Sequence, residues 1–196
     1  MGDLFVPLVL YSDSAEIYPG VMTMKDTCCF TGHRNIRKAD EESVKGKIRE
    51  QVLIQLENGV STFMVGGAMG FDMMAAEVLL DLREKEGKDL RIISALPFLQ
   101  WRERWPEEET EREDRILEKS DEILISSDAY NRKSYLDRDR MMVDRSAVCI
   151  AYCSRKTGGT AYTVRYALRQ GVKVRNLAEW DVSQLLKDTE EKPLVF

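Results

Sequence analysis

Residues 61–78 read STFMVGGAMGFDMMAAEV, in which a short apolar run, a glycine cluster and the start of a helical pattern follow one another directly. Gly66, Gly67 and Gly70 allow a tight turn whose backbone N–H groups can approach an anion, and the helix behind the turn adds unpaired donors. The sequence TGGT at residues 157–160 follows another apolar run in the same way. Either cluster alone is typical of an ordinary strand-to-helix connection, but two in one chain indicate a nucleotide site.

Short apolar strands alternate with helical patterns along most of the chain. Strands are expected at residues 27–32, 61–65, 90–96, 122–126, 147–152 and 172–176, and helices at residues 40–57, 71–86, 106–120, 135–145, 160–170 and 182–187. This alternation predicts an α/β fold, a Rossmann-like parallel sheet with helices on both faces in a single domain. Ligands of such sheets bind beyond the carboxyl ends of the strands, where both glycine clusters fall.

Composition limits the classes of protein and partner. The chain has 196 residues, of which 43% are hydrophobic, and its net charge is −5. The acidic balance argues against a broad electrostatic contact with nucleic acid, so nucleic acid is expected to be an unlikely partner and a small anionic ligand a better one. Residues 1–23 have few basic side chains and no helical period, and we treat them as an extension of uncertain order before a domain at residues 24–196.

Neither a membrane segment nor a metal site is expected. The apolar stretch at residues 4–11 is too short to span a bilayer and has no positively charged leader, which favours a cytoplasmic protein with no membrane partner. The four cysteines occur as Cys28-Cys29 and as Cys149 and Cys153, without the spacing of a zinc site. Buried, reduced thiols are the preferred interpretation.

The sequence TGHR at residues 31–34 closes the first expected strand with residues that suit an anion. Arg34 could hold a phosphate through two hydrogen bonds, and His33 could donate a hydrogen bond or transfer a proton. The alternative for His33 is that it only caps a loop or a helix start. In the charged segment at residues 131–142, Arg138 is expected to face the loops, because the neighbouring arginines fan around a short helix.

Two carboxylates near the first glycine cluster are candidates for binding sugar hydroxyls. Asp72 enters the first turn of the helix, where its alternative role is to cap N–H donors. Glu77 lies about 140° further around the helix in an apolar stretch and therefore needs a partner. That partner is either the ribose of a ligand, which we favour, or an arginine in a structural pair.

The segment after the third expected strand carries Phe98, Gln100 and Trp101. A nucleobase could stack on these rings, although such rings more often belong to a core or a lid. The charged stretch at residues 102–121 is expected to be a solvated helix face with little functional content.

Taken in order, five motifs resemble the YpsA-like branch of the SLOG superfamily over residues 25–177. They are TGHR at residues 31–34, GGAMGFD at 66–72 followed by Glu77, LPF at 96–98 followed by Gln100 and Trp105, RMMVD at 140–144, and GGTAY at 158–162. The resemblance implies a Rossmann-like fold and a nucleotide or ADP-ribose-like ligand, in a sensor or regulator linked to bacterial cell division or stress. Relatives in the superfamily include phosphoribohydrolases of the LOG type and DNA-processing proteins of the DprA type.

The sequence departs from the LOG-type pattern at the residues that this chemistry uses. Arg138 matches the arginine of that pattern, but Asp139 stands at the lysine position, and Tyr162 or Thr163 at that of the glutamate. Cleavage of an N-glycosidic bond needs a carboxylate to assist it, so we expect a binding protein. A homodimer remains open by analogy with related folds.

The alternative function is a nucleotide N-glycosidase or related hydrolase, for which the candidate catalytic residues are His33, Asp72, Glu77 and Arg138. A DprA-like single-strand binder is disfavoured by the acidic charge. No cofactor is expected beyond the nucleotide-type ligand. The expected ligand-binding residues are Gly32, His33, Arg34, Gly66, Gly67, Gly70, Asp72, Glu77, Gln100, Arg138, Gly158, Gly159 and Thr160.

Overall fold

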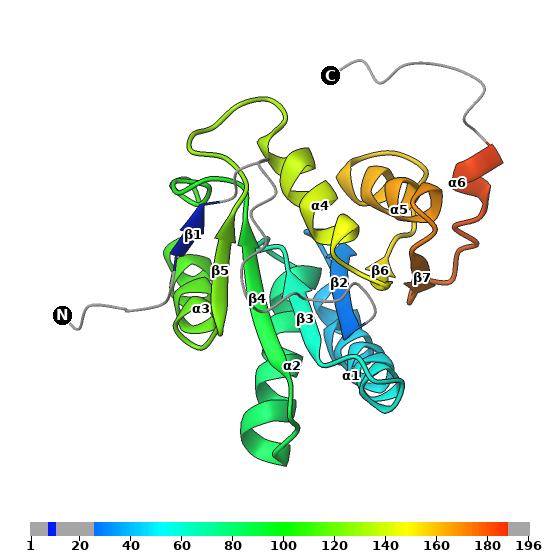
Figure 1. Cartoon of the computed structure of the whole chain (residues 1–196), viewed down its shortest axis with the longest axis horizontal. Coiled ribbons are helices and arrows are strands. Elements are labelled where there is room, and N and C mark those ends of the chain that lie inside the picture. Colours follow the sequence, from blue (N-terminus) through cyan, green and yellow to red (C-terminus); the bar gives the residue numbers. More distant parts are fainter. Residues whose placement is uncertain (1–7, 11–25, 188–196) are drawn as a thin grey trace.

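The computed structural model describes residues 8–10 and 26–187 (Figure 1). Its strands are β1 (Leu8–Leu10), β2 (Thr27–Gly32), β3 (Thr62–Val65), β4 (Arg91–Leu96), β5 (Glu122–Ile125), β6 (Val148–Tyr152) and β7 (Lys173–Asn176). Its α-helices are α1 (Glu41–Glu57), α2 (Phe71–Glu86), α3 (Glu107–Glu118), α4 (Ser134–Asp144), α5 (Gly159–Arg169) and α6 (Gln184–Lys187). Each expected helix and strand is present, with ends that differ by at most two residues.

The strands form one sheet in the order β1-β5-β4-β3-β2-β6-β7, and every pair of neighbours is parallel. The predicted α/β fold with a parallel sheet is therefore confirmed. The strand β1 lies within the segment treated as an extension, and it pairs with β5 at one edge of the sheet. Three residues are too few for an apolar pattern to predict a strand.

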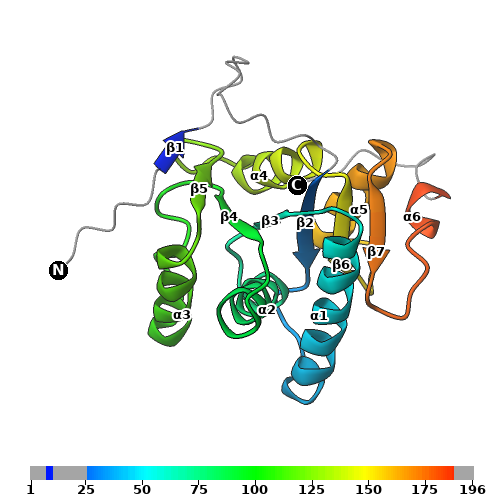
Figure 2. The same cartoon turned by 60° about the horizontal axis from the view of Figure 1, so that its bottom comes forward.

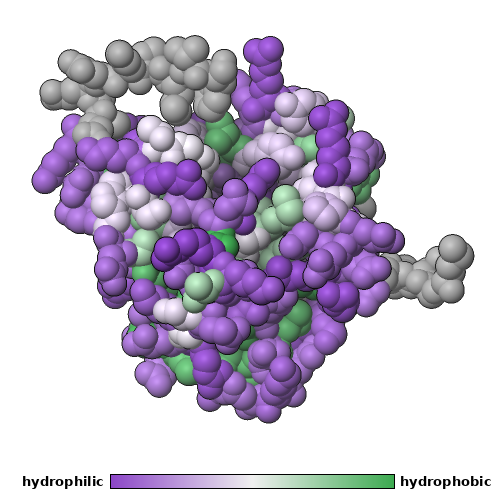
Figure 3. Space-filling model, turned by 180° about the vertical axis from the view of Figure 1, so that it is seen from behind, coloured by the Kyte–Doolittle hydropathy of each residue, from purple (hydrophilic) through white to green (hydrophobic). Residues whose placement is uncertain are grey.

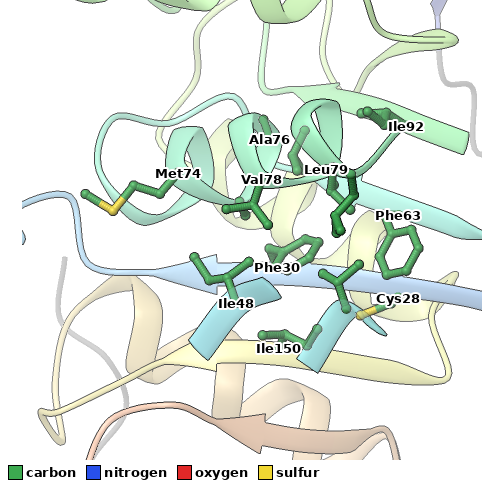
Figure 4. Close-up of a cluster of buried hydrophobic side chains, with 14 of the residues drawn as sticks. Cys28, Phe30, Ile48, Phe63, Met74, Ala76, Val78, Leu79, Ile92 and Ile150 are labelled. Carbon is green, nitrogen blue, oxygen red and sulfur yellow. The ribbon is translucent and has the colours of Figure 1, made fainter. Parts of the chain in front are cut away.

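Helices cover both faces of the sheet (Figure 2). Successive side chains of a strand point to opposite faces, so Cys28 and Phe30 enter one core while Cys29 enters the other. The first core lies under α1 and α2, where Phe30, Ile48 and Leu79 meet (Figure 4). The second lies under α4, α5 and α6. A smaller third cluster lies beneath the loop after β4.

The surface is mostly polar, as is usual for a folded domain in water. The face turned away from the viewer in Figure 1 is largely hydrophilic, with small separate apolar areas (Figure 3). Among the described residues, no helix has both the length and the apolar character needed to cross a bilayer.

Candidate functional site

The order of the strands marks where a ligand can enter. The chain runs outward from β2 through β3 and β4 to β5, and then returns to place β6 on the other side of β2. In parallel sheets such a reversal leaves a crevice beyond the carboxyl ends of the two strands concerned. The loops at residues 33–37 and 153–158, which follow β2 and β6, lie at this end of the sheet.

His33 connects these two loops. The backbone N–H of Ser154 donates to His33 Nε2 at 3.0 Å, and the Ser154 hydroxyl lies 3.1 Å from the same atom. Because Nε2 accepts from the backbone, we assign the ring proton to Nδ1. Burial, and then the positive charge of Arg155, lower the pKa of His33 below its ordinary value. The geometry therefore favours a neutral imidazole that fixes the loops over one that transfers protons.

Arg34 projects at the surface of the same edge. Its guanidinium carbon lies 5.7 Å from the centre of the Tyr135 ring, and it forms no ion pair with any described residue. Its backbone packs closely against the loop after β3, because a Cβ on Gly70 would lie 2.1 Å from the Arg34 carbonyl oxygen. A Cβ on Gly32 would similarly meet the Phe71 ring at 2.3 Å. Because Gly32 and Gly70 have no side chain, the end of β2 and the loop after it pack directly against the start of α2 and the loop before it. The Arg34 side chain is exposed.

The glycines of the loop before α5, unlike Gly32 and Gly70, lie in open space. Gly158 has a φ of 94°, and a Cβ on Gly158 or on Gly159 would meet nothing within 4 Å. No side chain caps the start of α5 by a hydrogen bond, so its first backbone N–H groups are available, with Thr160 in the first turn. Uncapped N–H groups and the positive end of the helix dipole are features that suit an anion at this position.

Two side chains from opposite layers of the fold converge on Gly66. A Cβ there would lie 2.5 Å from Asp72 Oδ2 of α2 and 2.6 Å from Arg138 Nη1 of α4. Arg138 is only 6% exposed, its Nε donates to Asp139 Oδ1 at 2.7 Å, and its Nη1 has no hydrogen-bond partner among the described residues. Arg138 therefore lies buried against the loop after β3, and its role in binding a ligand stays a prediction. Burial raises the pKa of Asp72 to about 7, although the charge of Arg138 opposes this.

Glu113 is a member of this cluster that the sequence analysis missed. It is 1% exposed, and neither carboxyl oxygen has a hydrogen-bond partner within the described part of the chain. A Cβ on Gly67 would lie 3.0 Å from Glu113 Oε1. Burial, followed by the charge of Asp72, raises the pKa of Glu113 to about 7.

The expectation that residues 102–121 form only a solvated face is therefore wrong at Glu113. The signal that could have found it is spacing, because Glu113 precedes Ile116 and Leu117 by three and four positions. These residues share the buried face of α3 with it.

Glu77 lies away from this cluster. Arg112 Nη2 donates to Glu77 Oε2 at 2.9 Å, and Lys45 Nζ lies 3.1 Å from the same oxygen. Burial raises the pKa of Glu77, but the hydrogen bonds and charges of Arg112 and Lys45 outweigh it and bring the pKa below its ordinary value. Of its two alternatives, the structural ion pair is the one that the structure contains, so we leave Glu77 out of the site.

The loop after β4 supplies one exposed amide and two buried rings. Gln100 is exposed, whereas Phe98 and Trp101 are 6% and 8% exposed and pack in the third cluster. The indole of Trp101 donates to the carbonyl oxygen of Gly67 at 2.8 Å. These two rings therefore support the loops from below and offer little surface to a base.

The cysteines are all free and buried. Cys29 and Cys149 face each other across β2 and β6, and their contact, together with burial, raises the pKa of Cys149 well above its ordinary value. The described residues contain no cluster of three or more side chains of the types that bind metals.

Comparison with known families identifies the chain. The YpsA family model, described as the YspA SLOG family, matches residues 28–184. The chain belongs to this YspA SLOG family. It is accordingly a Rossmann-like protein of a nucleotide-related superfamily, as the five sequence motifs predicted.

Two proteins from Bacillus resemble the chain at moderate identity. The UPF0398 protein of Bacillus cereus strain B4264 is 26% identical over 137 aligned residues, and the match covers 66% of this chain and 72% of that protein. A UPF0398 protein of Bacillus thuringiensis strain Al Hakam matches with the same identity and coverage.

Two solved structures share the fold of this SLOG chain. DNA processing protein A from Helicobacter pylori, described for its single-stranded DNA binding mode, has a TM-score of 0.58 and 20% identity, over 86% of this chain and 75% of its own. DprA from Streptococcus pneumoniae has a TM-score of 0.59 and 19% identity, over 83% and 56%.

The expectation that nucleic acid is an unlikely partner is wrong, because a protein of the same fold binds single-stranded DNA. The net charge of −5 is a sum over the whole SLOG chain and does not describe the sheet edge. The two loops at residues 33–37 and 153–158 contain four basic residues and no acidic one. Charge at the loops, not over the chain, is what an anionic partner meets.

The two departures from the LOG-type pattern are in contact in this SLOG member. Thr163 Oγ1 donates to Asp139 Oδ2 at 2.8 Å, while Asp139 Oδ1 accepts from Arg138 Nε. Thr163, one of the two residues that can stand at the glutamate position, thus contacts Asp139 at the lysine position, and Asp139 in turn pairs with Arg138.

Proposed function

We propose that this protein binds a phosphate-bearing nucleotide derivative, of the ADP-ribose type, beyond the carboxyl ends of β2 and β6 and acts as a sensor or regulator. The observation that carries the proposal is the start of α5. There Gly158 and Gly159 leave open space beside uncapped N–H groups, at the strand pair where the sheet order reverses. Family membership supports a nucleotide-type ligand.

Each part of the site has a role in this proposal. The N–H groups of the first turn of α5 and the Thr160 hydroxyl bind a phosphate. Arg34 compensates its charge from the neighbouring loop, and His33 holds the two loops in place through Ser154. Arg138 and Asp72 lie behind Gly66 and fix the loop after β3.

Binding without hydrolysis is the function that the side chains favour. A glycosidase needs a carboxylate that can assist at the anomeric carbon. The Glu77 carboxylate is paired with Arg112 and Lys45, and the carboxyl groups of Asp72 and Glu113 are buried away from solvent. A hydrolase would instead release free base from AMP, ADP-ribose or NAD, which proton NMR detects over hours.

The test of the ligand site is Gly159→Leu with Gly46→Leu as its control. Both glycines lack a left-handed φ, and a Cβ added to either would have no neighbour within 4 Å, so both variants should fold. Only Gly159 borders the proposed phosphate site, whereas Gly46 lies on α1. We expect Gly159→Leu to weaken ADP-ribose binding, measured by calorimetry, by about tenfold or more, or about 1.4 kcal/mol. Equal affinities for the two variants would contradict the assignment.

A second candidate function is binding of single-stranded DNA. The basic loops at residues 33–37 and 153–158 and the likeness to the Helicobacter pylori structure favour it. For a labelled oligodeoxythymidylate, Arg155→Ala should weaken binding and reduce the slope of log affinity against log salt by about 0.7 per lost phosphate contact. Lys88→Ala removes an equal charge from the opposite edge and should leave the slope unchanged.

A further inference from the structure

Tyr130 is the most exposed large hydrophobic side chain in the described part of the protein, at 66%. It lies in the loop between β5 and α4, at the same carboxyl edge of the sheet as the proposed phosphate site, and β4 and β3 separate β5 from β2. Leu99, in the loop after the neighbouring strand β4, is 48% exposed. An exposed ring at this edge of the sheet offers a flat apolar surface to a ligand.

The Tyr130 ring rests on a rigid base. Its centre lies 5.5 Å from that of Phe98, edge to face, and Phe98 meets Tyr135 in the same manner at 5.7 Å. Phe98 is 6% exposed and belongs to the third cluster with Leu96. A ring supported in this way loses little conformational freedom when a flat group stacks on it.

Cations lie next to the aromatic side chains. The guanidinium of Arg34 lies over Tyr135 at 5.7 Å, and Arg132 and Lys133, two and three positions after Tyr130, are exposed. A flat apolar surface joined to positive charge matches the two parts of a nucleotide, its base and its phosphate. Phe98 and Trp101, the rings expected from the sequence to hold a base, are too buried to do so.

We propose that Tyr130 is the stacking surface for a nucleobase whose phosphate is bound on the side of Arg34. The inference rests on the proposed function, in which Arg34 meets a phosphate, and adds to it the part of the site that takes the base. The nucleobase and its phosphate come either from a free nucleotide or from single-stranded DNA, since stacking on an aromatic ring tolerates every base.

The experiment compares Tyr130→Ala, Tyr130→Phe and the wild type against ligands with and without a base. The probes are AMP, GMP, CMP and UMP, ribose 5-phosphate, and an oligodeoxythymidylate. We expect Tyr130→Ala to weaken binding of the probes that contain a base about tenfold and to leave the affinity for ribose 5-phosphate unchanged. Tyr130→Phe should retain the wild-type affinity for every probe. Circular dichroism of both variants should match the wild type, because the side chain is exposed.

The outcomes separate the two proposals. A loss confined to the mononucleotides assigns the ring to a free nucleotide, and one confined to the oligonucleotide assigns it to DNA. Unchanged affinity of Tyr130→Ala for every base-containing probe, or an equal loss for ribose 5-phosphate, overturns the stacking inference while the phosphate site stands. If the wild type binds none of the probes, both the phosphate site and the stacking inference fall.

Discussion

The carboxyl group of Glu113 is buried from solvent, and neither of its oxygens has a hydrogen-bond partner among the described residues. An ionised carboxylate is unfavourable in such surroundings, and the proton that it keeps near pH 7 relieves the cost. Asp72, with a pKa raised to the same region, lies close enough to raise that of Glu113 further. Arg102 and Arg138 act in the opposite direction and lower the pKa of Glu113.

This arrangement makes folding depend on pH. The folded-state pKa of Glu113 is about 7, above its ordinary value of 4.5, so the native state binds the proton more tightly than the unfolded chain does. The stabilisation is fully present below pH 4.5 and is lost as the pH rises through 7, by at most about 1.4 kcal/mol per pH unit. We expect Glu113→Gln to flatten this fall and to be more stable than the wild type at pH 8.

Urea unfolding at pH 5, 6, 7 and 8 measures the effect. Glu111→Gln, an exposed change on the same helix, is the control and should follow the wild-type profile. Parallel profiles for Glu113→Gln and the wild type would show that the buried carboxyl group does not bind the extra proton.

Gly70 offers a separate test of how closely the loops pack. Its φ is 85°, and a Cβ would lie 2.1 Å from the Arg34 carbonyl oxygen. Gly171 has a φ of 74°, but a Cβ there would have no neighbour within 4 Å, so Gly171→Ala carries only the backbone strain. We expect Gly70→Ala to lower the free energy of unfolding by about 3 kcal/mol and Gly171→Ala by about 1 kcal/mol. Equal losses would mean that the two loops are able to move apart.

The helices α4 and α5 are joined by a side-chain bridge that passes through Asp139. Thr163 of α5 donates to one carboxylate oxygen of Asp139, and Arg138 donates to the other. Thr163 is 3% exposed, so the bridge is shielded from water. The contact holds α5, whose first turn is the proposed phosphate site, against the helix that carries Arg138.

A double-mutant cycle measures this bridge. Thr163→Val keeps the shape of the side chain and removes the donor, and Asp139→Asn weakens the acceptor. Each should lower the free energy of unfolding by about 1 to 2 kcal/mol, with a coupling energy of about 1 kcal/mol between them. Tyr166→Phe, which removes the hydrogen bond from Tyr166 to Asp144 at an exposed position, is the matched control. Strict additivity would show that the two side chains stabilise the helices independently.

Helices and strands were predictable where local pattern decides them. The strand β2 and the helix α2 have the expected ends, because an apolar strand and glycines at both helix ends mark them. Glu113 was not predictable from charge, since its burial depends on Trp101 and the loop after β3 meeting the face of α3. The sequence offered an arginine as one of two partners for Glu77, but the choice of Arg112 comes from packing of α2 on α3.

The two large cores lie on opposite faces of one sheet, and adjacent residues of β4 belong to different cores. Ile92 points into the core under α1 and α2, and Ile93 into the core under α4 and α5. Both are fully buried on a strand with neighbours on each side. The sheet therefore couples the two cores, and we expect them to unfold together.

Ile92→Val and Ile93→Val test this coupling. Each should cost about 1 kcal/mol and shift one common transition, seen at the same denaturant concentration by near-UV and far-UV circular dichroism. Different midpoints for the two signals in either variant would reveal two cores that unfold separately.

The facing thiols of Cys29 and Cys149 give the protein a built-in reporter. They lie on β2 and β6, the two strands whose ends border the proposed ligand crevice, and both are buried. A thiol reagent can label them only when β2 and β6 separate locally, so the labelling rate reports how often this part of the protein opens. A ligand that binds across the ends of β2 and β6 would slow the labelling in proportion to its occupancy, and its affinity could be read without knowing whether the protein changes the ligand.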